Sequence, residues 1–316
     1  MIKRAFVFPG QGSQHVGMGA TVVADWKTAR DVLTRLEDMI GKSVVDAMLN
    51  GPESRLRRTD LAQVAVFGLS VALTRVLGRC NVEPTVVAGH SLGEFSALVA
   101  AGWLDFDAAA EIVAHRANAM AACCRRRPGA MSAVMGVDPA VLRSLLAADE
   151  TSHGQTVVAA NFNAPDRTVI SGDAAAVERV ERVISTEALG AAQSLSVDGA
   201  FHSPLMRPAE DEMVPMIARL PLREGHTPLI SSITGDLVHD VESYRAALAR
   251  QITAPVRWAE AVRVLLAHRV DQIVEVGPGK ALLGLIRKVD RHQQLKTCAQ
   301  SSEIHALSGS LDSAPA

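Results

Sequence analysis

The sequence predicts an α/β fold in which helices pack on a mostly parallel β-sheet. Short apolar runs alternate along the chain with longer segments of helical periodicity, and this alternation is typical of β-α-β units. Of the 316 residues, 48% are hydrophobic and 21% are charged, a globular composition that excludes wholesale disorder. Because only 3% are aromatic, we expect a core of Ala, Val, Leu and Ile, which suits close-packed helices and inner strands.

The first part of the chain contains two expected strands and the helices that follow them. In order, these elements are a strand at residues 5–8, helices at 29–40 and 61–77, a strand at 85–88, and helices at 92–101 and 107–120. A glycine-rich turn follows each strand. Residues 61–77 are the most apolar segment, but Gln63, Thr74 and Arg75 lie within its helical period. We therefore interpret this segment as a buried helix rather than a membrane span.

A change of composition after residue 125 predicts a small domain inserted into a larger one. Residues 125–129 hold three arginines, a proline and a glycine, and we expect them to break the preceding helix. The elements expected next are a strand at 130–137, a helix from 139, strands near 157–161 and 169–171, a helix at 174–188 and a strand near 193–197. This β-α-β-β-α-β order is that of the ferredoxin-like motif, so we assign residues 126–197 to a ferredoxin-like subdomain.

The larger domain is expected to comprise residues 1–125 together with 198–296. The expected elements of its second part are helices near 244–251 and 258–268, a strand at 272–276 and a last helix from 280. Residues 297–316 are rich in Ser and Ala, and we expect them to form a frayed tail.

Charge and cysteine content exclude several classes of protein. A net charge of −2 argues against a nucleic-acid binder, which usually carries a strongly basic face. The four cysteines lack the paired spacing of a zinc site, so no bound metal is expected. The apolar run after Lys3 and Arg4 is too short for a signal peptide, and no run of eighteen apolar residues is present. We therefore expect a soluble, reduced, cytoplasmic protein that binds no membrane.

Ser91 is the strongest candidate nucleophile. It lies in Gly89-His90-Ser91-Leu92-Gly93, a Gly-x-Ser-x-Gly pattern between a predicted strand and a predicted helix. In this context the pattern is a nucleophile elbow, whose tight turn exposes the serine hydroxyl. The alternative is an ordinary glycine-rich turn. The backbone N–H of Leu92, at the start of the helix, is placed to bind a developing oxyanion.

His202 is the best placed of ten histidines to act as the base that Ser91 needs. It follows a predicted strand and comes downstream of the serine, in the chain order of hydrolase-like folds. The alternative is a loop histidine without a catalytic role. No acid is obviously placed to orient it, so either Asp198 or a backbone carbonyl could do so.

Arg116 falls in the middle of an apolar helix face formed by Ile112, Val113, Ala119 and Met120. A guanidinium on an inward face needs a partner, because an unpaired buried charge is costly. The partner is either an internal Asp or Glu, or the carboxylate of a substrate held by two hydrogen bonds.

Together with further motifs, these residues resemble the malonyl-CoA:acyl carrier protein transacylases, which include the fatty-acid enzymes and the acyltransferases of polyketide synthases. The matching segments are residues 8–14 (Phe-Pro-Gly-Gln-Gly-Ser-Gln), 89–94 (Gly-His-Ser-Leu-Gly-Glu), Arg116, 161–165 with 169–172, 200–203 (Ala-Phe-His-Ser), Gln251 with 255–258, and 275–278. They occur in order, with spacing similar to that of the family. The resemblance implies an α/β-hydrolase-like core with the ferredoxin-like insertion.

The resemblance also implies roles for site residues. Ser91 is expected to be the nucleophile and His202 its base, while the backbone N–H groups of Gln11 and Leu92 form the oxyanion hole. Arg116 is expected to hold the malonyl carboxylate.

Three further residues are implied at the substrate site. Gln251 lies where the family keeps a residue whose backbone carbonyl replaces the usual triad acid, and Gln63 matches a glutamine that lines the pocket. Phe201 resembles the residue of malonyl-specific polyketide acyltransferases, where a ring crowds the α-methyl group of methylmalonyl. The sequence departs from the common polyketide pattern at Asp198 and Gly199, where those relatives often have Ser and His.

The implied reaction moves a malonyl group from malonyl-CoA to the phosphopantetheine thiol of an acyl carrier protein through a malonyl-serine ester. No cofactor is expected beyond the phosphopantetheine on the acceptor. We expect a free-standing acyltransferase that supplies a polyketide synthase assembly line or fatty-acid synthesis. The alternatives are a proofreading thioester hydrolase, which would share Ser91 and His202, and a scaffold that only docks a carrier protein.

Overall fold

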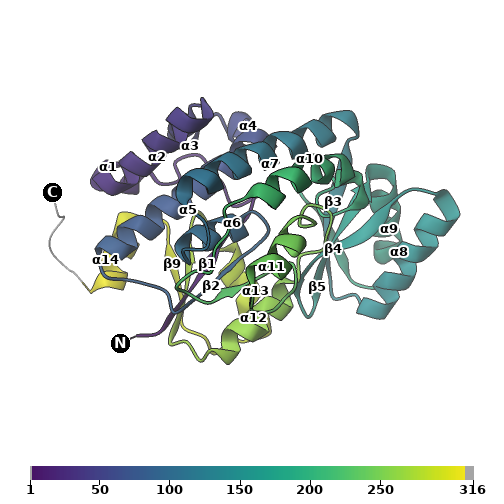
Figure 1. Ribbon diagram of the computed structural model, residues 1–316. Helices are drawn as coiled ribbons and strands as arrows, with labels where there is room; N and C mark the ends of the chain where they lie inside the picture. The colour runs from purple at the N-terminus through teal and green to yellow at the C-terminus, as the bar shows by residue number, and fades with distance from the viewer. Residues whose placement is uncertain (1, 310–316) are drawn as a thin grey trace.

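The computed structural model describes residues 2–309 and has an α/β fold with two separate sheets (Figure 1). The larger sheet has the order β7-β2-β1-β8-β9, and all neighbouring strands in it are parallel. Its strands are β1 (Arg4–Phe8), β2 (Val86–Gly89), β7 (Leu229–Ile230), β8 (Gln272–Val276) and β9 (Leu295–Cys298). The mostly parallel sheet expected from the alternation of elements is confirmed.

Helices cover both faces of the larger sheet, and alternate residues of its strands contact the two sides. Phe6 and Phe8 of β1 belong to a large apolar cluster with one group of helices, whereas Ala5 and Val7 pack with the other. The first group contains α2 (Lys27–Ile40), α5 (Thr59–Arg79), α6 (Gly93–Ala100), α7 (Phe106–Arg126) and α10 (Arg207–Arg219). The second contains α12 (Trp258–Ala267) and α13 (Ala281–Val289).

Of the helices within residues 2–309, α5 alone is long and apolar enough to cross a membrane, by length and composition. However, 83% of its most apolar window is buried inside the protein. Its residues pack against α2 and α7 and belong to the main apolar cluster. The helix is therefore a core helix, as the polar residues within its period indicated.

The smaller sheet is antiparallel and has the order β4-β5-β3-β6. Its elements, in chain order, are β3 (Gly129–Met135), α8 (Pro139–His153), β4 (Val157–Ala164), β5 (Arg167–Asp173), α9 (Ala174–Thr186) and β6 (Ala191–Ser194). Leu142, Leu146, Val177, Val180 and Ile184 of the two helices pack with strand residues in an apolar cluster of their own. The expected order of strands and helices is present, with the last strand beginning two residues earlier than expected.

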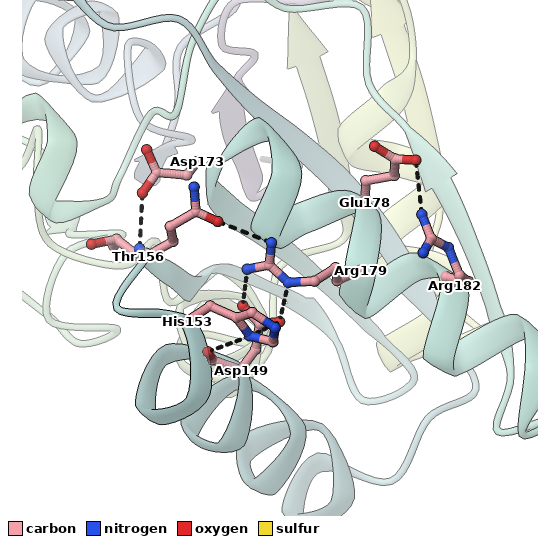
Figure 2. Close-up of polar contacts among 8 residues, drawn as sticks. Asp149, His153, Thr156, Asp173, Glu178, Arg179 and Arg182 are labelled. Atoms are coloured by element: carbon pink, nitrogen blue, oxygen red, sulfur yellow. Dashed lines mark hydrogen bonds and ion pairs between the residues drawn. The ribbon is translucent and has the colours of Figure 1, made fainter.

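A partly buried ion pair ties α8 to α9. Figure 2 shows Arg179 of α9 directed at Asp149 of α8, and its Nε and Nη2 each donate to one carboxylate oxygen at 2.7 Å. The guanidinium holds the pKa of the Asp149 carboxyl below its usual range. At the upper left of Figure 2, Asp173 at the end of β5 accepts a hydrogen bond from the backbone N–H of Thr156 at 2.9 Å. These contacts fix the unit that forms one wall of the cavity described below.

Two expectations about element boundaries are wrong. The helix expected to stop before residue 125 continues as α7 to Arg126, and Pro128 rather than the arginines ends it. Arginine is a good helix former, and the basic residues of the last turn favour the carbonyl end of the helix. Cys123 and Cys124, just before the arginines, are buried, so the last turn still packs on the core.

The tail expected at 297–316 is ordered as far as the structure describes it. β9 extends the large sheet to Cys298, and α14 (Ser301–Ser308) follows. A capping box joins Gln300 to Glu303 at the start of α14, and Ile304 and Leu307 pack into the main core. The larger domain therefore continues beyond residue 296. Residues 310–316 of the predicted tail lie outside the described residues.

Of the remaining short elements, only one was expected from the sequence. They are α1 (Ala20–Asp25), α3 (Val44–Asn50), α4 (Glu53–Leu56), the 3₁₀-helix η1 (Pro204–Met206) and α11 (Val241–Leu248). Of these, α11 was expected three residues later in the chain. It supplies Tyr244, a buried residue that contacts the region around the functional site.

Candidate active site

Ser91 lies on a strained turn between β2 and α6. Its φ is 53°, in the left-handed region that residues other than glycine rarely adopt. A Cβ added to Gly89 would lie 2.1 Å from the backbone of Gly93, and one added to Gly93 would lie 2.0 Å from the carbonyl oxygen of Phe8. Both glycines of the motif are therefore required by close backbone approach. This is the geometry expected of a nucleophile elbow.

His202 contacts Ser91 through one ring nitrogen and the backbone through the other. The distance from Ser91 Oγ to His202 Nε2 is 2.7 Å. His202 Nδ1 lies 3.0 Å from the carbonyl oxygen of Gln251 and 2.9 Å from that of Ala254. Because a carbonyl only accepts, Nδ1 carries the proton, and Nε2 is left to accept the hydrogen bond of the Ser91 hydroxyl.

Backbone carbonyls, and not the carboxylate of Asp198, contact the ring of His202. Asp198 is directed elsewhere, and its Oδ2 accepts a hydrogen bond from Thr59 Oγ1 at 3.4 Å. His202 is itself held by its backbone N–H, which donates to the carbonyl of Ile252 at 3.1 Å, and its φ is 57°. The segment that follows α11 thus holds His202 through three carbonyl groups, two at the ring and one at the backbone N–H.

Burial keeps the imidazole of His202 neutral. Desolvation, with a further contribution from the nearby Arg116 cation, lowers the pKa of His202 from 6.5 to about 3. A histidine must be unprotonated at Nε2 to accept a proton from serine. The base is therefore in the required form throughout the neutral and mildly acidic pH range.

Arg116 is buried on α7, and its partners are neutral groups. Its Nε donates to Gln251 Oε1 at 3.1 Å, Nη1 to Gln63 Oε1 at 2.5 Å and Nη2 to Ser91 Oγ at 3.1 Å. No carboxylate within residues 2–309 forms an ion pair with it. Burial lowers its pKa to about 10, so the guanidinium stays charged at neutral pH.

These three bonds use only part of the donor capacity of Arg116. A guanidinium has five N–H donors, so two of them remain without a partner among the described residues. One of them is on Nη2, which contacts the Ser91 hydroxyl directly, and the other is on Nη1. A carboxylate on an acyl group attached to Ser91 would therefore find a charged group with free donors next to it.

A cavity of about 360 Å³ opens over these residues. Its wall includes Ser91, His202, Arg116, Gln63 and Phe201. Apolar side chains from both units complete it, among them Met120 and Leu282 from helices of the larger unit and Met131, Val169 and Leu195 from the smaller one. Gln251 is not on this wall; it is 3% exposed and lies behind Arg116 and His202, so it acts on the cavity through them.

Gln11 and Leu92 also line the cavity, and the backbone N–H of neither has a hydrogen-bond partner within the described chain. Leu92 precedes the first residue of α6, where helix N–H groups point outward. The turn that holds Gln11 is fixed by its side chain, which donates to Thr59 Oγ1 and accepts from Gln63 Nε2, both at 3.1 Å. Two free N–H donors thus belong to residues that line the same cavity as Ser91.

Sequence reasoning missed two buried polar residues near Ser91. Asn163 Oδ1, on β4, accepts a hydrogen bond from His90 Nε2 at 2.9 Å. Glu94 of α6 is fully buried. The signal for Glu94 was available, because it is a charged residue next to Phe95, Ala97 and Leu98 on an apolar helix, the same kind of observation that identified Arg116.

Comparison with known proteins places this geometry in a family. The acyl transferase domain family matches residues 5–305. The malonyl CoA-acyl carrier protein transacylase of Bacillus subtilis is 35% identical over 302 residues, which cover 95% of this chain and 94% of the relative. The corresponding enzyme of Escherichia coli K12 is 36% identical over 290 residues, covering 92% and 93% of the two chains.

Solved structures of the same kind of enzyme have the same fold as this chain. The malonyl CoA-acyl carrier protein transacylase of Coxiella burnetii superposes with a TM-score of 0.92 at 32% identity and 98% coverage of both chains. A malonyl-transacylase solved in complex with its type II PKS acyl-carrier protein also has a TM-score of 0.92, at 32% identity, with 97% of this chain and 99% of that chain covered. The chain therefore belongs to the acyl transferase domain family and, within it, to the malonyl CoA-acyl carrier protein transacylases.

Proposed function

We propose that this enzyme transfers a malonyl group from malonyl-CoA to the phosphopantetheine thiol of an acyl carrier protein, by way of a malonyl ester on Ser91. The observation that carries the proposal is the convergence on Ser91 Oγ of His202 Nε2 at 2.7 Å and Arg116 Nη2 at 3.1 Å. A nucleophile, a neutral base and a cation with free donors suit a donor whose acyl group ends in a carboxylate. The relatives named above use this donor and acceptor.

In the first half-reaction, the Ser91 hydroxyl adds to the thioester carbonyl while His202 Nε2 takes its proton. The carbonyl oxygen becomes an oxyanion, which the N–H groups of Gln11 and Leu92 stabilise. The C–S bond then breaks, and the imidazolium of His202 returns the proton to the sulfur, so that CoA leaves as a thiol. Arg116 pairs with the malonyl carboxylate throughout.

In the second half-reaction, the carrier's phosphopantetheine thiol takes the place of CoA. His202 removes the thiol proton, the sulfur adds to the ester carbonyl, and the same two N–H groups bind the oxyanion. Collapse breaks the bond to Ser91 Oγ, and His202 returns the proton to the serine. The two half-reactions balance without a redox step, so we propose that the enzyme uses no cofactor of its own and that the phosphopantetheine belongs to its partner.

The finer architecture is part of the same proposal. We assign residues 1–125 and 198–309 to an α/β-hydrolase-like catalytic domain and residues 126–197 to a ferredoxin-like subdomain. Two separate sheets and an apolar cluster confined to the smaller unit support this division. The β3-α8-β4-β5-α9-β6 order supports the ferredoxin-like assignment of residues 126–197.

We also propose a cytoplasmic location, which suits the four free cysteines. The partner we propose is a carrier protein of fatty-acid or polyketide synthesis.

Intact-mass spectrometry tests the function. After brief incubation with malonyl-CoA, the wild-type chain is expected to gain one malonyl group, and the Ser91→Ala variant none. A phosphopantetheinylated carrier protein should discharge this adduct much faster than water does. Steady release of CoA with no carrier dependence would instead indicate a thioester hydrolase, and the absence of both adduct and CoA release would contradict the proposed donor.

Phe201 provides a test of acyl selectivity. Its ring lies on the cavity wall directly before His202 and is 6% exposed. Because the ring occupies space that an α-methyl group would need, Phe201→Ser is expected to raise the ratio of methylmalonyl to malonyl loading about tenfold. Phe201→Tyr, which keeps the ring, serves as the matched control and should retain the malonyl preference. If Phe201→Ser leaves the ratio unchanged in competition between the two CoA esters, this role for Phe201 is wrong.

A further inference from the structure

Glu94 is a buried carboxylate that the reaction proposed above does not use. It lies on α6, three residues after Ser91, and is 0% exposed. Its Oε1 accepts hydrogen bonds from Ser231 Oγ at 2.6 Å and Tyr244 OH at 3.0 Å, and its Oε2 from Ser232 Oγ at 3.0 Å. Burial raises the pKa of the Glu94 carboxyl, whereas the hydrogen bonds that these three neighbours and Gln251 donate act against burial and favour the ionised form.

The side-chain amide of Gln251 joins Glu94 to Arg116. Its Nε2 donates to Glu94 Oε2 at 3.3 Å and to the carbonyl of Ser91 at 3.0 Å, while its Oε1 accepts from Arg116 Nε at 3.1 Å. The two acceptors at Nε2 determine which end of the amide is nitrogen. The amide dipole therefore lies along the line between the two charges, with its oxygen toward the cation and its nitrogen toward the anion.

We propose that Glu94 is the internal counter-ion of Arg116, set one amide away from it by Gln251, and that it positions and tunes the guanidinium for the malonyl carboxylate. This inference deepens the proposed function and rests on it for the identity of the carboxylate. It combines the two alternatives that the sequence left open for Arg116. An internal acid is present, but Gln251 separates it from Arg116, so it does not use the N–H donors of the guanidinium that a substrate carboxylate needs.

The spacing matters because a direct partner would compete with the substrate. A carboxylate in contact with Arg116 would use the same paired N–H donors that a malonyl carboxylate needs. Without any counter-ion, a buried guanidinium would be costly in the free enzyme. An anion held behind one amide offsets this cost and leaves two donors free. It also repels the malonyl carboxylate weakly, which favours release of the acyl group to the carrier.

Gln251 connects the same anion to the base. Its side chain is held by Glu94 and Ser91, and its backbone carbonyl accepts from His202 Nδ1 at 3.0 Å. Glu94 is thus a positioning residue for both Arg116 and His202, since one glutamine contacts all three. The ionisable groups around Arg116 are Glu94 on α6, His202 after β6 and, one contact further, Tyr244 on α11.

A double-mutant cycle tests the coupling without any substrate. Glu94→Gln keeps the shape of the side chain, removes its charge and replaces one acceptor oxygen by a donor, and Arg116→Gln removes the cation. If the two charges are partners, the urea midpoint of the double variant should lie well above the value obtained by adding the two single losses. Additive losses would overturn the inference. If Glu94→Gln alone does not fold, a folded double variant still supports the pairing, and a double variant that also fails to fold contradicts it.

Kinetics of the Glu94→Gln variant test the effect on the donor. Removal of the anion should strengthen the attraction of Arg116 for malonyl, so the KM for malonyl-CoA is expected to fall about threefold to tenfold relative to the KM for acetyl-CoA. Acetyl-CoA is the reference because any loss that reaches His202 affects both donors alike. Removal of the Glu94 charge also lowers the pKa of Arg116, because the anion favours the charged guanidinium. The alkaline limb of malonyl loading should therefore move to lower pH, whereas acetyl loading should show no such shift.

Tyr244→Phe is the matched control, because it removes one hydrogen bond from Glu94 and no charge. It is expected to lower stability and to leave the ratio of malonyl to acetyl loading within about twofold of wild type. A proportional loss of both activities in Glu94→Gln, with an unmoved alkaline limb, would make Glu94 a purely structural residue. Because the stability cycle needs no donor, it separates a failure of this inference from a failure of the proposed reaction.

Discussion

Replacement of His202 by alanine is expected to slow the acylation of Ser91 by about ten-thousandfold. Ser91 Oγ has its hydrogen bond to His202 Nε2 at 2.7 Å, and no other neutral base lies within hydrogen-bond distance of it among the described residues. A positioned general base contributes about a hundredfold to ten-thousandfold, and a base paired with a nucleophile lies at the upper end. Rapid-quench measurement of CoA release from malonyl-CoA gives this rate directly.

The same base predicts an unusual pH profile. Because the pKa of His202 is lowered from 6.5 to about 3, the unprotonated form persists as the pH falls through 6.5. The acylation rate should therefore stay level between pH 8 and about pH 5, where an ordinary histidine would have lost most of its activity. A fall centred near pH 6.5 would contradict the burial and cation effect described here.

Unlike the acylation rate, the stability of the folded chain is expected to fall as the pH is lowered over that window. Between about pH 3 and 6.5 the unfolded chain binds a proton at His202 that the folded chain does not, so this residue makes folding less favourable as the pH falls. Acylation must therefore be measured in short reactions, with circular dichroism to show that the enzyme remains folded. Under those conditions a loss of rate reports the base and not unfolding.

The sequence carried clear signals for some of this site and none for other parts. Gly89 and Gly93 mark the turn at Ser91 because backbone atoms approach too closely for any side chain. Arg116 was recognisable as a charge on an apolar helix face, and it is buried as expected. Glu94 is likewise a charged residue among apolar ones, but α6 has only 8 residues, too few for an apolar helix face to be recognised in the sequence.

The groups that orient His202 could not be predicted from composition or spacing. They are backbone carbonyls of Gln251 and Ala254, which lie 49 and 52 residues further along the chain. Any residue type supplies a carbonyl, so no pattern of side chains marks such a contact; only the family resemblance indicated Gln251. The order of α14 was missed for a different reason. Its Ser- and Ala-rich composition suggested a frayed tail, although Gln300 and Glu303 have the spacing of a capping box.

Replacement of Arg116 by alanine is expected to lower the ratio of malonyl to acetyl loading by about a hundredfold. Truncation of one partner of a buried charge pair costs about 2–5 kcal/mol, which corresponds to about thirtyfold to several-thousandfold. The loss should fall on malonyl, because only that acyl group has a carboxylate to pair. Competition between malonyl-CoA and acetyl-CoA, read as the two adduct masses on Ser91, measures the ratio in a single reaction.

Arg116→Lys separates the charge from the geometry of this contact. Lysine keeps a cation but lacks the planar fork that donates to both oxygens of a carboxylate, so it should recover only part of the malonyl preference. It also cannot bond Gln251, Gln63 and Ser91 at once in the way that the guanidinium does. If alanine leaves the ratio unchanged, the cation serves the fold and not the substrate. If lysine restores the full preference, charge alone is sufficient, and the paired donors of the guanidinium are not what selects malonyl.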